Sequence, residues 1–380
     1  MYSHKRTLWP DMERWRAQAA ASEGGVFTLP GGTLAVADAT GARDALLGPA
    51  ENHVRESAFL RLGRQTLTER QRTEAVQGLL TVLGRHDGAR TTDVHRLIAA
   101  LGGGGGRLAH QGWGVRAVHA HFAGALAHRR SAEMSRLINT YVCDSTIASA
   151  VVGRAKWRTR RTEHALRERF AEHLRRLPVP EGEPNDVIDV VLALDGEFST
   201  LDRAQLLQRL ILSTVGFTGI TLEWAILLAY QSGRDSAELT EAEARALVQE
   251  ALRLYPTAWR LWRVAEKPHQ IGGCPVDHGG DVLIDLHAIH RSAVWDEPDA
   301  FDPDRWSRAT REQRAAYLPF GKGEQMCPAN GFALRALEEL CLSILRDYRG
   351  EVHVAPGRLP HARTLLAPPR GWAQVARRAA

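Results

Sequence analysis

The 380-residue sequence has few cysteines and no long uncharged run. The cysteines lack the paired spacing of a disulfide framework, which suits a reducing cytoplasm; they are Cys143, Cys274, Cys327 and Cys341. Residues 1–6 lack the apolar run of a signal peptide. The longest uncharged helical run, 210–222, is too short to span a bilayer. These absences predict a cytoplasmic protein without a membrane anchor.

Several conspicuous features lack the residues that would give them a special function. The glycine run at 102–106 has no Gly-Lys-Ser/Thr after it, which excludes a phosphate-binding loop. His119 and His121 have no acid or cysteine at metal-ligand spacing, so structural or exposed roles are expected. The basic run at 156–161 predicts a solvated helix face rather than a nucleic-acid site. With 44% hydrophobic residues, the chain 1–380 can form a single domain around one large core.

The most informative segment that is present is 318–327, a glycine-containing loop that ends in Cys327. Gly321 and Gly323 let the backbone adopt positive φ or approach a flat ligand closely. Apolar residues follow the cysteine at helical spacing; they are Phe332, Ala336, Leu337, Leu340 and Ile344. We therefore expect Cys327 at a helix N-terminus, where amide donors and the helix dipole stabilise a thiolate. A thiolate in such a loop can bind a large planar metal cofactor, the alternative being a buried free cysteine.

This loop resembles the haem-binding loop of the cytochrome P450 family. The family pattern is Phe, Gly, any, Gly, any, Arg or His, any, Cys, any, Gly or Ala. Five positions fit it, namely Phe320, Gly321, Gly323, Cys327 and Ala329. Gln325 departs from this pattern, which has Arg or His at that position. In the family that basic residue helps to neutralise a haem propionate. The resemblance implies haem b, iron protoporphyrin IX, with Cys327 as the iron ligand and Phe320, Gly321, Gly323 and Gln325 beside the cofactor.

Two further motifs strengthen the resemblance. Glu250 and Arg253 lie three apart in a helical stretch, 241–254, that stops at Pro256. Arg305 follows some 50 residues later in the segment Pro-Asp-Arg-Trp. The family has a Glu-x-x-Arg helix followed by a Pro-x-Arg-aromatic segment, and the resemblance implies a buried triad that braces the haem loop. Buried charges need this kind of pairing.

The order of the predicted elements favours a mainly α protein of the α+β class. Residues 26–36 predict a β-hairpin, and almost every segment from 38 to about 254 is helical. Short strands are expected near 270–284, 351–354 and 364–367. The resemblance implies the cytochrome P450 fold, in which small peripheral sheets surround a helical body and a long central helix crosses the haem.

The apolar helix at about 203–230 fits that central helix, but its motif departs from the family. Where the family has an acid and a threonine, this chain has Thr218 and Gly219. Thr214, Thr218 and Thr221 share one helix face and are candidates for a replacement proton relay with ordered water. The alternative is that these hydroxyls bond back to helix carbonyls and only line the pocket.

The resemblance also implies cationic or hydrogen-bonding partners for the haem propionates. On an early helix the candidates are His110, Trp113 and Arg116, although the spacing of Trp113 and Arg116 is one residue shorter than in the family. Arg263, after the Glu-x-x-Arg helix, fits better. Because Gln325 is neutral, these cations matter more than usual.

These observations lead to three hypotheses of function. The first is a monomeric haem-thiolate monooxygenase that oxidises an apolar small molecule, as enzymes of secondary metabolism do, with electrons from a ferredoxin or flavodoxin. The net charge of +5, with Lys322 and Arg335 near the cysteine, would steer such an acidic donor. The second is a peroxide-driven, coupling or desaturating variant without the usual acid and threonine. The third is a haem-binding protein without turnover.

Overall fold

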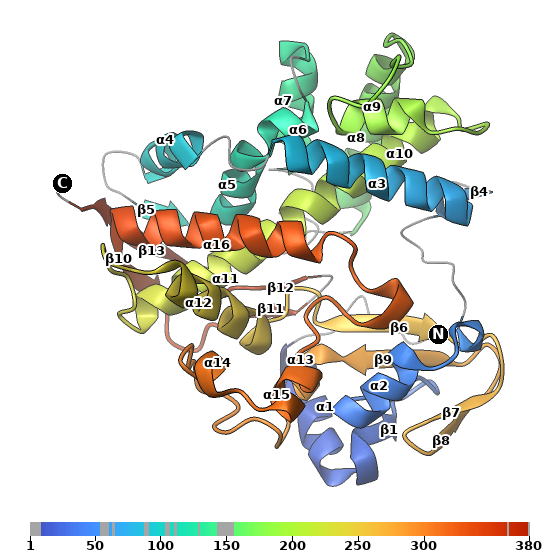
Figure 1. Cartoon of the computed structure of the whole chain (residues 1–380), viewed down its shortest axis with the longest axis vertical. Helices are drawn as coiled ribbons and strands as arrows, with labels where there is room; N and C mark the ends of the chain where they lie inside the picture. Colours follow the sequence, from blue (N-terminus) through green and yellow to red (C-terminus); the bar gives the residue numbers. More distant parts are fainter. Residues whose placement is uncertain are drawn as a thin grey trace.

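Helices make up most of the protein, and small sheets lie along its edges (Figure 1). The structure is a computed structural model, and it describes residues 9–53, 61–62, 65–86, 91–102, 107–109, 112–127, 130–142, 156–362 and 365–378. Within these ranges the mainly α character and the small sheets confirm the predicted α+β class.

The helices form two groups around the long α16 (Asn330–Asp347). Helices α3 to α10 lie above α16 in Figure 1, and α1, α2 and α13 lie below it, beside the largest sheet. In chain order the first helices are α1 (Trp9–Ala21), α2 (Ala39–Leu47), α3 (Glu69–Arg85), α4 (Thr91–Gly102), α5 (Trp113–His121), α6 (Ala123–Leu126), α7 (Ala132–Thr140), α8 (Lys156–Arg175), α9 (Val187–Ala193) and α10 (Thr200–Ile211). Later in the chain come α11 (Phe217–Gln231), α12 (Glu241–Leu254), α13 (Leu286–Ile289), α14 (Arg305–Arg308) and α15 (Arg311–Ala316).

The largest sheet has four strands in the order β1-β2-β9-β6. The predicted hairpin forms its edge as β1 (Val26–Thr28) and β2 (Leu34–Val36). Strand β9 (Asp281–Asp285) pairs in parallel with β2 and antiparallel with β6 (Arg260–Val264), a strand that sequence analysis did not predict. The remaining strands are β3 (Arg61–Leu62), β4 (Gln65–Thr66), β5 (Arg107–Ala109), β7 (His269–Ile271), β8 (Cys274–Val276), β10 (Tyr348–Val354), β11 (His361–Ala362), β12 (Leu366–Ala367) and β13 (Gly371–Arg377).

The central helix is continuous over 200–231 but is interrupted by a π-helical turn, Leu212–Gly216, between α10 and α11. Every residue of α11 from Thr218 to Tyr230 is buried, as its apolar surface predicts. Among the described residues this is the one helix apolar and long enough to cross a membrane, and 83% of its most apolar window is buried inside the protein. A buried helix in the core of a globular protein also meets these criteria of length and hydropathy. Turns of the π type often occur at functional sites, and this one ends two residues before Thr218.

Helix α12 has the bounds that the sequence predicts, and local signals explain both ends. At its start the Thr240 hydroxyl accepts from the amide of Glu243, while the Glu243 carboxylate accepts from the amide of Thr240. This reciprocal capping box satisfies two free donors of the first turn. Pro256 follows the last residues of the helix and prevents its continuation. The buried face of α12 carries Glu250 and Arg253 towards the core.

Candidate active site

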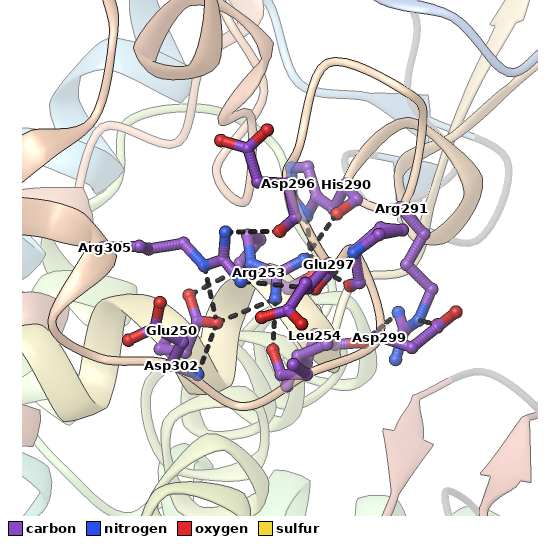
Figure 2. A network of polar contacts seen from close by, with 12 residues as sticks. Glu250, Arg253, Leu254, His290, Arg291, Asp296, Glu297, Asp299, Asp302 and Arg305 are labelled. Atoms are coloured by element: carbon purple, nitrogen blue, oxygen red, sulfur yellow. Dashed lines mark hydrogen bonds and ion pairs between the residues drawn. The ribbon is translucent and has the colours of Figure 1, made fainter.

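A buried ion network begins on α12 (Figure 2). The side chains of Glu250 and Arg253 are both fully buried. The Arg253 guanidinium donates to the two carboxylate oxygens of Glu250 at 2.7 and 3.0 Å, and Nε of Arg305 donates to one of them at 3.0 Å. Charges out of contact with water are tolerated when they are paired and hydrogen-bonded in this way. The structure therefore brings together the three residues of the predicted triad.

The other guanidinium nitrogens of the network bind backbone carbonyls. Arg253 donates, at 2.7 to 2.9 Å, to the carbonyls of His290, Pro298 and Ala300. Arg305 donates to the carbonyls of Asp296 and Glu297. These bonds fix the irregular chain between α13 and α14, which α15 and the cysteine loop follow (Figure 2).

The cysteine loop, residues 318–327, is held in shape by its own backbone. The amide of Gly321 donates to the carbonyl of Leu318 at 2.9 Å, and the amide of Cys327 donates to the carbonyl of Phe320 at 3.0 Å. Gly321 and Gly323 have φ of 72° and 77°, a region that favours glycine. A Cβ at Gly323 would lie 2.3 Å from the carbonyl oxygen of Leu46 on α2, so only glycine permits this close contact.

Cys327 lies three residues before the first residue of α16, Asn330, and its side chain is half-buried. Burial raises the pKa of the Cys327 thiol above its ordinary value, and a hydrogen bond from the Ala329 amide opposes that shift only in part. Burial therefore outweighs the amide donor that was expected to stabilise a thiolate here. A positive charge at this sulfur, such as a bound metal ion, would lower the pKa and favour the thiolate.

Strand β6 lies against the cysteine loop and carries a cation on the same side. A Cβ at Gly321 would be 3.3 Å from Cδ1 of Leu261, which places this leucine beside the loop. Residues two apart on a strand share a face, so Arg263 is on the same face as Leu261. Among the described residues Arg263 has no carboxylate partner; its guanidinium donates to the backbone carbonyl of Trp262, and burial lowers its pKa. A partly buried cation of this kind suits an anionic ligand.

The other residues predicted to lie near the haem propionates differ in their position and burial. Trp113 and Arg116 both lie on α5, where Trp113 is buried and Arg116 is half-buried without a carboxylate partner in the described part of the chain. His110 lies outside the described residues. Gln325 is exposed, so the loop itself adds no buried polar group at this position.

The central helix excludes a threonine at the family position by direct contact with α5. A Cβ at Gly219 would lie 2.3 Å from Cα of Val115, and one at Gly114 would lie 2.3 Å from the carbonyl oxygen of Gly219. The two helices thus meet backbone against backbone at this pair of glycines. No side chain fits at either position unless the helices separate, because packed interiors leave no spare volume.

The three threonines on the central helix are all buried but differ in their partners. Thr214 donates to the carbonyl of Leu210 at 2.8 Å, as the back-bonding alternative predicts. Thr221 approaches the carbonyl of Phe217 at 3.0 Å and the hydroxyl of Thr257 at 2.8 Å. The Thr218 hydroxyl has no hydrogen-bond partner in the described part of the chain, so it is the one hydroxyl of the three left free for a ligand or water.

Glu223, one turn after Gly219, orients the start of α5. Its carboxylate accepts from the amides of Gly112 at 2.6 Å and Gly114 at 2.9 Å, and the residue is buried. A carboxylate at a helix N-terminus satisfies free amides and interacts favourably with the dipole. Glu223 therefore fixes the helix that carries Trp113 and Arg116.

A sequence model of the family described as "Cytochrome P450" matches residues 244–372. This range contains the triad and the cysteine loop, which the structure shows to be linked through the chain between α13 and α15. This part of the chain belongs to the cytochrome P450 family. The family's cofactor is haem, in which a cysteine thiolate binds the iron.

Relatives and solved structures agree with this assignment. Cyclooctatin synthase of Streptomyces melanosporofaciens is 30% identical over 181 residues, which cover 40% of this chain and 39% of that protein. Cyclooctat-9-en-7-ol 5-monooxygenase of the same organism is 34% identical over 108 residues, or 28% and 24% of the two chains. A zebra fish cytochrome P450 solved with progesterone has a TM-score of 0.73 at 19% identity, covering 97% of this chain and 100% of that one. The first of these relatives is thus matched over about two fifths of its length, while the P450 fold extends over nearly the whole chain.

The residues of this P450 fit a haem. Cys327 offers one sulfur from a loop that glycines hold close to α2 and β6. Arg263 and Arg116 are cations without carboxylate partners among the described residues, and a haem carries two carboxylates that need such partners. The described residues contain no competing cluster of three His, Cys, Asp or Glu side chains that could hold a metal ion. Among the described residues, the sulfur and the two cations are therefore groups suited to the cofactor.

Sequence analysis missed two side chains with direct contacts to this site. The Thr257 hydroxyl forms a hydrogen bond with the hydroxyl of Thr221, which lies 36 residues earlier in the sequence. The imidazole of His290 contacts both Arg253 and the start of the cysteine loop. Neither belongs to one of the motifs, and no local pattern in the sequence distinguishes them. Only the fold brings them to their partners.

Proposed function

We propose that this P450 is a haem-thiolate monooxygenase that oxidises an apolar small molecule. The observation that carries the proposal is the cysteine loop, which presents Cys327 beside α16 and follows a chain segment fixed by the fully buried Glu250–Arg253–Arg305 triad. When bound, the haem supplies the activation of dioxygen with two electrons. The protein supplies the sulfur ligand, the shape of the pocket and the path for protons.

Individual residues have separate tasks in this proposal. Cys327 would bind the iron, and the glycines of the loop would leave room for the cofactor beside the backbone. Arg263 and Arg116, with Trp113, hold the cofactor's carboxylates. The buried threonine face of the central helix binds water or substrate, with Thr218 offering its unpaired hydroxyl.

The wider setting is proposed from the family and the composition. We propose one domain over residues 1–380, a cytoplasmic monomer, and a ferredoxin or flavodoxin as electron donor. Exposed Lys322 and Arg335, near Cys327 in the sequence, would attract such an acidic protein. The names of the two Streptomyces relatives concern small molecules, which supports a role in secondary metabolism.

One observation favours a second function. Gly219 replaces the threonine of the family and cannot be exchanged for it without moving α5, so proton delivery differs from the family pattern. A peroxide-driven oxidation, or a coupling or desaturation in which the substrate moves protons, requires less of that delivery. A haem-binding role without turnover is the remaining alternative.

A reconstitution experiment separates these functions. The haem-loaded protein is mixed with ferredoxin, its reductase and NADPH, and metabolites that displace water from the ferric iron in an optical titration are used as substrates. The proposal expects substrate-dependent NADPH consumption with one atom of labelled dioxygen in the product. Product formed with hydrogen peroxide alone, and not with the reductase system, would favour the second function. No product under either condition would contradict both.

Replacing Thr218 by valine should reduce the fraction of electrons recovered in product by about tenfold or more, with a matching rise in released hydrogen peroxide. The reason is that Thr218 has the unpaired hydroxyl on the threonine face, and positioned proton transfer commonly contributes at least this much. Thr214→Val is the matched control, because that hydroxyl is occupied by the carbonyl of Leu210. Equal product yields and peroxide release in the two variants would show that Thr218 does not take part in proton delivery.

A further inference from the structure

His290 connects the ion network to the cysteine loop through its imidazole ring. The residue follows α13 and is fully buried. Its Nδ1 lies 3.1 Å from the carbonyl oxygen of Arg253, and its Nε2 lies 2.9 Å from the amide nitrogen of Leu318, the first residue of the loop. One side chain therefore joins α12, which carries Glu250 and Arg253, to the loop that carries the sulfur. Figure 2 shows His290 beside Arg253.

The two partners determine which form of the imidazole is present. The Leu318 amide can only donate, so Nε2 must accept and carries no proton. The Arg253 carbonyl can only accept, so Nδ1 must carry the proton and donate. The ring is thus a neutral imidazole with a single tautomer, and protonation of Nε2 would break the bond to the loop.

Burial and the nearby cations keep the ring in this neutral form. Desolvation, then the charge of Arg253, then that of Arg291 lower the pKa of His290 to about 3, against the opposing effect of the backbone carbonyls. The contact is therefore insensitive to pH near neutrality. Arg253 adds a second bond by donating from Nη1 to the carbonyl of His290 at 2.9 Å.

From Leu318 the connection continues through the loop to the sulfur-bearing residue. The carbonyl of Leu318 accepts from the amide of Gly321, and the carbonyl of Phe320 accepts from the amide of Cys327. The ring of Tyr317 also packs on His290, with centroids 5.7 Å apart, so the residue before the loop is held by the same side chain. The start of the loop is thus tied directly to one buried histidine, and backbone bonds within the loop extend the connection to Cys327.

We propose that His290 is a positioning residue that sets the geometry of the haem-thiolate bond by fixing the amide of Leu318 relative to the Glu250–Arg253–Arg305 triad. This inference rests on the proposed function, since it requires Cys327 to be the iron ligand. It adds a fourth side chain to the triad. The triad holds the segment before the loop, and His290 transmits that position into the loop itself.

The test compares His290→Leu with His290→Asn in the haem-loaded protein. Leucine fills the space without polar groups, whereas asparagine keeps one donor and one acceptor. After reduction and addition of carbon monoxide, we expect His290→Leu to lose at least half of the far-red Soret band to the band of a protein without thiolate ligation. His290→Asn should recover much of that loss. Without haem, the Leu318 amide of His290→Leu should exchange hydrogen about tenfold or more faster than wild type.

The matched control is His287→Leu. His287 is equally buried on α13, but its Nε2 lies 3.8 Å from the carboxylate of Glu13 on α1. All variants are compared well below their own unfolding temperatures, so that the spectra report folded protein. A full far-red band in His290→Leu, or an equal loss in His287→Leu, would overturn the proposal. Absence of the band in wild type would instead contradict the proposed function.

Discussion

Replacing Cys327 by serine should abolish the far-red Soret band of the reduced, carbon monoxide-bound protein. That band requires a thiolate ligand on the iron, and Cys327 is the one thiol in the loop 318–327. The hydroxyl of serine is a far weaker acid than a thiol, so it cannot replace the thiolate as a ligand. Haem content and the optical spectrum after reduction measure the result, and monooxygenase activity should fall below detection.

The control for this prediction is Cys274→Ser on strand β8. Cys274 is a free, half-buried cysteine in the sheet of β7 and β8, and it lies outside the loop. Its replacement should leave both the band and the activity close to those of the wild type. Persistence of the far-red band in Cys327→Ser, or its loss in Cys274→Ser, would show that Cys327 does not bind the iron.

Glu250→Gln should lower the free energy of unfolding by about 3–5 kcal/mol, the usual effect of removing one partner from a buried ion pair. The carboxylate of Glu250 accepts five hydrogen bonds, from Nε and Nη2 of Arg253, Nε of Arg305, the amide of Asp302 and Nε1 of Trp306. A glutamine amide nitrogen is a donor and would face some of these donors directly. Two arginines would then remain buried without a countercharge. Urea unfolding followed by circular dichroism measures the change.

Glu243→Gln is the matched control for this loss. The two residues are on the same helix, but Glu243 is exposed and forms the capping box with Thr240, a role that glutamine can also fill. Its replacement should change the free energy of unfolding by less than about 1 kcal/mol. Equal unfolding midpoints for the two variants would mean that the triad does not stabilise this part of the protein.

Local signals explain why part of the structure was predictable. Helix α12 has strong caps at its start and a proline after its end, and the hairpin of β1 and β2 turns at Pro30-Gly31-Gly32. The spacing of Glu250, Arg253 and Arg305 matches a family pattern, so sequence alone suggested that they meet. Each of these predictions depended on neighbouring residues or on a known pattern.

Pairings between distant segments were not predictable in the same way. Strand β13 pairs with β5, which lies more than 250 residues earlier, and three-residue strands such as β5 have too few positions to show a period. The protonation of Cys327 also depends on burial, which outweighs the amide donor that the sequence suggested. The tertiary environment decided both outcomes.

The contact between Gly114 and Gly219 limits how this protein can change. To regain a threonine at 219, α5 would have to move away from the central helix, and Glu223 would then release the amides of Gly112 and Gly114. A Gly219→Thr substitution by itself would therefore clash with the backbone of α5 unless the two helices separate. An engineer wishing to graft the acid and alcohol onto this chain would have to redesign two helices together.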